Sequence, residues 1–151
     1  MYRPEKIISG GQSGVDRAAL DIAIELGISH GGWCPAGRKA EDGPIPPHYC
    51  LRETRETDYA TRTRLNVRDS DGTLILTLGD ISSGTLKTFE IAKELGRPLL
   101  LMDLNKPLAN SEFQNWLSTN QIKVLNIAGP RESKYSGIQL RAGDCLKDLL
   151  D

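Results

Sequence analysis

Three short turns rich in glycine, serine and threonine carry the residues of this sequence best suited to binding chemistry. The first is Gly10-Gly11-Gln12-Ser13-Gly14, the second Ser82-Ser83-Gly84-Thr85, and the third Gly129-Pro130-Arg131-Glu132-Ser133. Glycine has no Cβ, so the oxygens of a ligand can approach the backbone N–H groups of such turns closely. Where a turn opens a helix, the first N–H groups lack partners and the helix dipole favours an anion. The turns therefore predict a site for phosphate or another oxyanion.

Side chains at these turns extend the prediction. Ser13 adds a hydroxyl, and Arg131 supplies a guanidinium, which is a natural partner for phosphate. Asp16 either pairs favourably with the helix dipole or accepts a hydrogen bond from a ligand. Arg38 follows a predicted strand and is a further candidate for neutralising an oxyanion. We expect ligand contacts from Gly10, Gly11, Gln12, Ser13, Gly14, Asp16, Arg38, Ser82, Ser83, Gly84, Thr85, Gly129, Pro130, Arg131 and Ser133.

Each turn also has a purely structural interpretation, which the residues leave open. Ser13 in the first turn and Ser82 or Ser83 in the second would serve as helix N-caps, and the third turn would be a solvated surface loop. The first turn matches neither GxGxxG nor a P-loop, which argues against ordinary NAD binding and P-loop ATP hydrolysis. The roles of Arg62, Arg68 and Cys34 also stay open.

The residues suggest no catalytic set and no metal site. No Ser/His/Asp combination or carboxylate pair stands at a readable spacing, so no nucleophile can be assigned together with its base. The cysteines are three in number, widely spaced and without a CxxC pair. This pattern argues against a disulfide framework and against structural zinc.

Strands alternate with helices along the chain. Apolar runs predict strands at 6–9, 28–34, 73–78, 98–102 and 122–127, and helical periodicity predicts helices at 15–26, 57–68, 86–95, about 113–117 and 138–149. This order is typical of right-handed βαβ units. We expect a Rossmann-like, three-layer α/β sandwich with a mostly parallel sheet of five to six strands and helices on both faces.

The expected sheet would bring the three turns together. Each turn follows a predicted strand, and parallel strands place all their carboxyl ends at one edge of the sheet. Ligands bind at this edge where the strand order reverses. The turns should therefore line one pocket although they lie far apart in the sequence.

Length and composition set the broad class. The chain has 151 residues, of which 38% are hydrophobic and 26% charged, so we expect one globular domain over 1–151. Its net charge of −1 provides no general basic field for nucleic acid. We see no run that could cross a membrane and no signal peptide, which leads us to expect a cytoplasmic protein.

Five blocks spread over nearly the whole chain carry a family resemblance. They are ISGGQSGVDRAA (8–19), GGWCP (31–35) followed by Gly37-Arg38, EDGPIP (41–46), NVRDSDG (66–72) and IAGPRES (127–133). These blocks resemble the molybdenum cofactor carrier proteins. That family belongs to a broad Rossmann-like group, which includes enzymes labelled lysine decarboxylases that are mostly nucleotide phosphoribohydrolases.

The resemblance implies a soluble carrier that assembles as a homo-oligomer, a dimer or a tetramer. Its carried ligand would be the molybdenum cofactor, a pterin with a terminal phosphate, and no structural metal is implied. The enzyme relatives have a Pro-Gly-Gly-x-Gly-Thr-x-x-Glu turn with a catalytic Glu. Here Thr88 stands at that position and Glu90 lies two residues later, about 200° away around a helix. A non-catalytic binding protein is therefore preferred; the alternatives are a nucleotide phosphoribohydrolase or related nucleotide-processing enzyme, and a nucleotide-sensing module.

Overall fold

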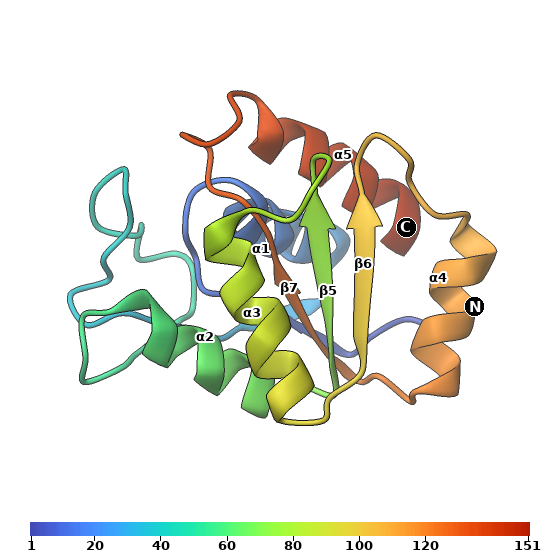
Figure 1. The fold of residues 1–151 in the computed structure, drawn as a ribbon, viewed down its shortest axis with the longest axis horizontal. Helices are drawn as coiled ribbons and strands as arrows, with labels where there is room; N and C mark the ends of the chain where they lie inside the picture. Colours follow the sequence, from blue (N-terminus) through green and yellow to red (C-terminus); the bar gives the residue numbers. More distant parts are fainter.

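The computed structural model describes residues 1–151 as a succession of strands and helices (Figure 1). The strands are β1 (Lys6–Ile8), β2 (Ser29–Gly31), β3 (Trp33–Cys34), β4 (Arg52–Glu53), β5 (Gly72–Thr77), β6 (Leu99–Asp103) and β7 (Val124–Ala128). The helices are α1 (Val15–Leu26), α2 (Tyr59–Arg68), α3 (Ser83–Glu94), α4 (Asn110–Thr119) and α5 (Ile138–Leu150). None of the helices is both long and apolar enough to cross a membrane.

Five strands form the main sheet, in the order β2-β1-β7-β5-β6, and all pair in parallel. Every residue of β5 is buried, as expected for a strand that is covered on both faces. Ile7, Leu74 and Leu125 point to one face, where they join the main hydrophobic core. The architecture confirms the predicted Rossmann-like α/β sandwich.

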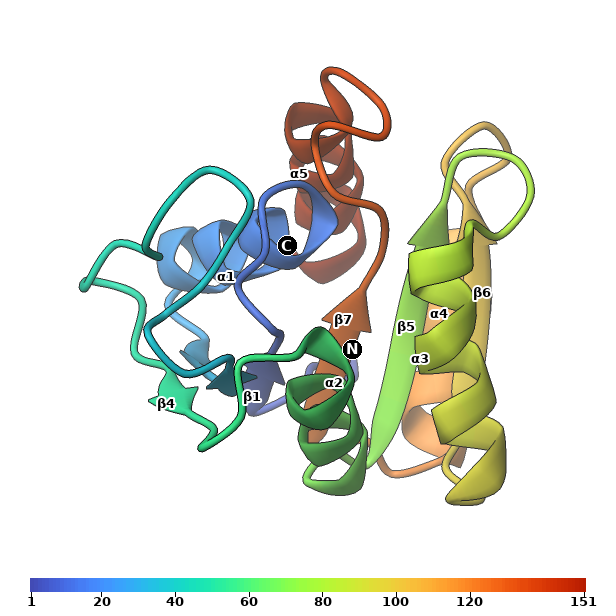
Figure 2. The same ribbon diagram turned by 60° about the vertical axis from the view of Figure 1, so that its left-hand side comes forward.

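Helices cover both faces of this sheet (Figure 2). Residues of α1, α4 and α5 pack into the main core on one face, where α1 lies against α5. On the opposite face α2 packs against α3, and Val67, Ile91 and Ala92 form a smaller apolar cluster there. The apolar stripe of each helix is thus buried against the sheet.

The chain leaves β1 and β5 toward opposite faces of the sheet. From β1 it passes through α1 to β2, whereas from β5 it passes through α3 to β6. Strand β7 lies between β1 and β5, so its carboxyl end is flanked by the turns that begin α1 and α3. This is the topological switch point at which open α/β sheets bind ligands.

The predicted strand over 28–34 is wrong as one element, because the chain divides at Gly32. Gly32 has φ +126°, and a Cβ there would lie 2.3 Å from the Ser9 carbonyl oxygen. Beyond this residue β3 leaves the main sheet and pairs with β4, which the sequence analysis did not predict. A strand of two residues is too short to show a periodic pattern.

Two helix starts also differ from the prediction. Helix α2 begins at Tyr59, and its N-cap is Asp58 rather than Thr57: the Asp58 carboxylate accepts a hydrogen bond from the Thr61 N–H at 3.0 Å. Helix α3 begins at Ser83, three residues before the predicted start. Ser83 and Gly84 are therefore in the first turn of a helix.

Candidate functional site

The three turns line one pocket of about 480 Å³ at the carboxyl end of β7. Eleven of the residues expected from the sequence contribute to its wall: Gly10, Gln12, Asp16, Ser82, Ser83, Gly84, Thr85, Gly129, Pro130, Arg131 and Ser133. Four expected residues lie outside the lining: Gly11, Ser13, Gly14 and Arg38. The structure thus brings together residues from all three turns.

Eleven further residues line the pocket and were not among those expected from the sequence. They are Tyr59, Ala60, Arg62, Thr63, Asn66, Lys87, Thr88, Asn126, Ile127, Ala128 and Lys134. Four of these belong to the first two turns of α2, which lies beside α3. Helix α2 follows an irregular loop, and its sequence contains no signal that places it at this edge.

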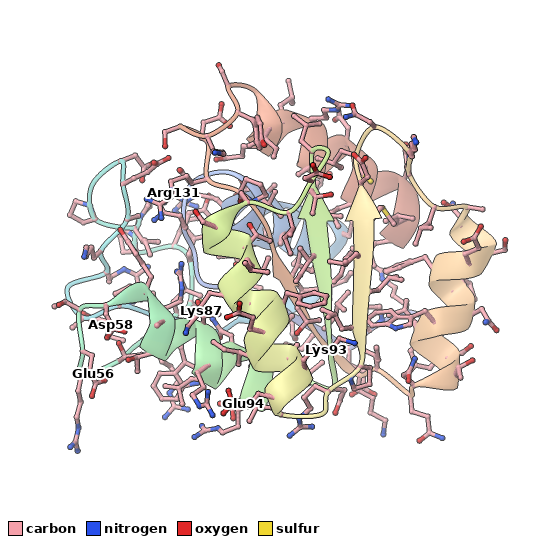
Figure 3. All side chains as sticks on the ribbon, viewed as in Figure 1. Glu56, Asp58, Lys87, Lys93, Glu94 and Arg131 are labelled. Atoms are coloured by element: carbon pink, nitrogen blue, oxygen red, sulfur yellow. The ribbon has the colours of Figure 1, made fainter.

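The charges of the pocket lining are strongly unbalanced. Arg62, Lys87, Arg131 and Lys134 are basic, whereas Asp16 is the only carboxylate in the lining. In Figure 3, Arg131 and Lys87 lie toward the N-terminal half of α3, and Lys93 and Glu94 lie toward its other end. Two of the four basic lining residues, Arg131 and Lys87, thus lie near the N-terminal half of α3.

Three basic side chains lie close to the aromatic ring of Tyr59. The Arg62 and Arg131 guanidinium carbons lie 5.1 and 5.3 Å from the centre of the Tyr59 ring, and Lys39 Nζ lies 4.7 Å from it. Cations over an aromatic face are attracted by its quadrupole. The ring thus stabilises three like charges close to one another, a concentration that an anion would further stabilise.

The buried Arg62 side chain fixes the floor of the pocket. Its Nη1 donates a hydrogen bond to the Gly10 carbonyl at 2.8 Å. A Cβ on Gly10 would lie 2.2 Å from the same nitrogen, so a larger residue would displace the guanidinium from this position. The glycine is therefore explained by a contact within the protein and needs no ligand.

Asp16 is a buried carboxylate in this floor. Burial raises its pKa, while Arg62 and the backbone N–H groups of Gln12 and Gly129 act in the opposite direction. The nearest Arg62 nitrogen lies 3.9 Å from the carboxylate oxygen, which is longer than a hydrogen bond. Asp16 thus lacks a direct hydrogen bond from its nearest cation.

The N-terminus of α1 is closed by groups from elsewhere in the chain. The Gly14 N–H donates to the Gln139 side chain at 2.9 Å, and the Val15 N–H donates to the Pro130 carbonyl at 3.1 Å. The Ser13 N–H donates to Gln12 Oε1 at 3.0 Å. The backbone N–H groups of Ser13, Gly14 and Val15 are therefore engaged within the protein and are not free for a phosphate.

The N-terminus of α3 is open by comparison. Ser82 caps it in an extended conformation without a side-chain hydrogen bond to the helix backbone. The first helical N–H with a partner is that of Leu86, which donates to the Ser82 carbonyl at 2.7 Å. The N–H groups of Ser83, Gly84 and Thr85 have no partner in the chain and belong to residues that line the pocket. Their position favours an anion.

Glu41 lies in the proline-rich loop over 35–51, between β3 and β4, and links this loop to two of the turns. Its carboxylate accepts hydrogen bonds from the Ser13 and Ser133 hydroxyls and from the Ser133 N–H, the last at 3.1 Å. Burial alone raises the pKa of Glu41, but these hydrogen bonds outweigh it and hold the pKa below its ordinary value. The Ser13 hydroxyl is thus engaged with Glu41 and lies outside the pocket lining.

Arg38 has a structural position in the proline-rich loop. Its guanidinium donates to the carbonyls of Ile45, Pro46 and Tyr49 at 2.9, 2.8 and 2.8 Å. These bonds hold the loop in a compact turn. Arg38 does not line the pocket. The sequence analysis had expected it near the oxyanion because it follows a predicted strand.

Comparisons with known proteins place this architecture in a family. The model of the circularly permutated YpsA SLOG family matches residues 7–150. The chain belongs to this family. A crystal structure of a protein named "Putative molybdenum carrier protein", from Syntrophus aciditrophicus, is 44% identical to this YpsA-type chain, with a TM-score of 0.95 over 98% of this chain and 96% of that one. Among curated proteins, no sequence matches this YpsA-type chain. The family resemblance drawn from the sequence is confirmed.

Two further observations bear on the chemistry of the pocket. Thr88, which the sequence resemblance aligns with the catalytic Glu of the enzymes, is buried and lines the pocket, whereas Glu90 is exposed and lies outside the lining. No group of three His, Cys, Asp or Glu side chains is placed to hold a metal ion. The lining thus combines four basic side chains with hydroxyl and amide groups and one carboxylate.

Proposed function

We propose that this protein is a carrier that binds a phosphate-bearing small molecule, the molybdenum cofactor, at the carboxyl edge of its sheet. The observation that carries the proposal is the free N-terminus of α3 in a basic pocket at the switch point. The unpartnered N–H groups of Ser83, Gly84 and Thr85 would hold the phosphate oxygens. Lys87 and Arg131 would neutralise its charge. The name of the 44% identical relative supports molybdenum cofactor as the ligand.

A pterin phosphate suits the pocket in size as well as in charge. A volume of about 480 Å³ lies within the range of small-molecule sites. The walls combine amide, hydroxyl and aromatic groups, which suit a polar heterocycle. A carrier needs affinity without turnover, and Thr88 at the position of the relatives' Glu is consistent with that role.

Anaerobic isothermal titration calorimetry with purified molybdenum cofactor tests this function. We expect saturable binding at micromolar protein concentration, and weaker binding of AMP. Failure to bind the cofactor together with tight binding of AMP would overturn the assignment.

Buried Asp16 in the pocket favours one alternative, a nucleotide phosphoribohydrolase. A carboxylate whose pKa is raised by burial beside a phosphate site has the features of a general acid or base. Incubation with nucleoside monophosphates would then release free base, and Asp16→Asn would abolish the release. The carrier function predicts no base release by the wild-type protein. Base release that instead disappears in Glu90→Ala would also support the hydrolase alternative.

A further inference from the structure

Asp16 is the one negative group in a pocket whose other charged groups are all positive. A carboxylate repels phosphate, so it adds nothing to anion binding and weakens it at short range. It also carries a desolvation cost, since it is buried and its pKa is raised by that burial. Asp16 is therefore the candidate in this pocket for a second kind of ligand contact, one with hydrogen-bond donors of the ligand.

The Asp16 carboxylate has acceptor capacity that its nearest cation does not use. An ionised carboxylate has about four acceptor positions. The nearby backbone N–H groups of Gln12 and Gly129 lower its pKa, whereas Arg62 Nη1 lies 3.9 Å away and donates to Gly10 instead. Asp16 lines the cavity. A ligand that carries hydrogen-bond donors can therefore occupy the remaining acceptor positions of its carboxylate.

We propose that Asp16 recognises a pair of N–H donors on the ligand ring, namely the ring N–H and exocyclic amino group of a 2-aminopyrimidin-4-one. This inference rests on the proposed function, because the phosphate over α3 leaves the ring to face the floor of the pocket. Pterin carries such a donor pair. Two parallel N–H···O bonds to one carboxylate give both affinity and orientation.

Recognition of the two N–H donors by Asp16 would make the site specific for the ligand ring. A ring that presents a carbonyl in place of the amino group would bring an acceptor against the carboxylate, leaving both without a donor. Sites built around a ligand donor reject analogues that lack it far more strongly than apolar pockets reject a missing methylene. Asp16 thereby distinguishes 2-amino rings from their 2-oxo counterparts.

Two phosphate esters that differ at one position provide the test. The probes are 6-hydroxymethylpterin phosphate and 6-hydroxymethyllumazine phosphate, in which an oxo group replaces the 2-amino group; inorganic phosphate is the reference. Wild-type protein should bind the pterin ester at least about tenfold more tightly than the lumazine ester. Equal affinities would overturn the inference. Neither probe carries a ribose diol, so a diol contact to Asp16 would also appear as equal affinities.

The Asp16→Asn variant assigns the preference to this residue. Its amide offers a donor as well as an acceptor, so the two esters should bind within about threefold of each other. Asp148→Asn, an exposed position on α5, removes the same charge and should keep the full preference. A preference that persists in Asp16→Asn would contradict the assignment.

A measurement on the wild-type protein covers the case in which Asp16→Asn does not fold. Ring donors stabilise the ionised carboxylate, so the pterin ester should move the ¹³Cγ titration of Asp16 to lower pH. Arg62 and Arg17, the charged groups that act on Asp16, are present in every arm. Inorganic phosphate should not lower this midpoint, and an unchanged midpoint with the pterin ester would overturn the inference. Failure of both esters and of inorganic phosphate to bind would instead overturn the phosphate site itself.

Discussion

At the scale of single residues, Arg131 connects the third turn to the rest of the pocket. Its guanidinium lies over Tyr59, and it takes part in none of the ion pairs of the protein. An unpaired guanidinium in a pocket lining can form a charge-assisted hydrogen bond with a ligand without first breaking an internal one. Its contribution to binding is therefore directly measurable.

Arg131→Ala should weaken the binding of 6-hydroxymethylpterin phosphate by about tenfold, as expected for the loss of one charge-assisted hydrogen bond. Titration calorimetry at low and high salt measures the effect, which should shrink as salt rises. Lys123→Ala removes the same charge just before β7, at the opposite edge of the sheet, and should leave affinity unchanged. Equal affinities of Arg131→Ala and wild type would exclude Arg131 from the site.

Glu41 should make stability depend on pH. Its pKa is lowered in the folded protein, so its contribution is present above the ordinary value of 4.5 and is lost as the pH falls through the folded value. Glu41→Gln should cost about 1 kcal/mol or less at pH 7, since the side chain is largely exposed. Urea unfolding from pH 7 to pH 3 should show the difference from wild type vanishing toward low pH. Glu5→Gln, exposed before β1, is the matched control, and a difference that does not depend on pH would contradict the role.

At the scale of elements, the two glycine turns that open helices have different roles. The turn before α1 packs under the third turn, and a Cβ on Gly14 would lie 2.4 Å from the Pro130 carbonyl oxygen. The turn before α3 has open space at Gly84, where a Cβ would have no other atom within 4 Å. One turn is a packing element and the other faces the pocket.

Two alanine substitutions separate these roles. Gly14→Ala should destabilise the fold by about 2–4 kcal/mol, because its φ of +89° is strained for alanine and the Cβ meets the backbone. Gly84→Ala lies in a helix with room for the methyl group and should stabilise by up to about 1 kcal/mol. Urea unfolding midpoints measure both variants. Similar midpoints for the two would contradict the division of roles.

The contrast between these two turns shows which features of the site could be predicted from the sequence and which could not. Glycine density and the strand–helix order correctly predicted that all three turns meet at one edge of the sheet. The donors around Gly14 were assigned to a ligand because their partners, Pro130 and Gln139, lie more than a hundred residues away. Such long-range hydrogen bonds leave no periodic signal. The sequence analysis did not identify Tyr59 and left the role of Arg62 open. Both residues belong to α2, which follows an irregular loop whose path the sequence does not predict.

At the scale of the whole molecule, the parallel sheet explains why the pocket lies where it does. Strand β7 comes late in the chain yet lies between β1 and β5, so one site is assembled from the first, middle and last thirds of the sequence. Alternating strands and helices predicted the fold class. The small β3–β4 sheet could not be predicted, because it depends on the close approach of Gly32 to Ser9.

Amide NMR of the uniformly ¹⁵N-labelled protein during a titration with 6-hydroxymethylpterin phosphate tests the central claim most directly. Hydrogen bonds to phosphate oxygens change the shielding of the donating amides. We predict saturable downfield shifts of the Ser83, Gly84 and Thr85 N–H resonances, with little change at Gly14, whose N–H already donates to Gln139. Shifts confined to the Gly10–Gly14 turn, or no saturable shift at the start of α3, would contradict the account.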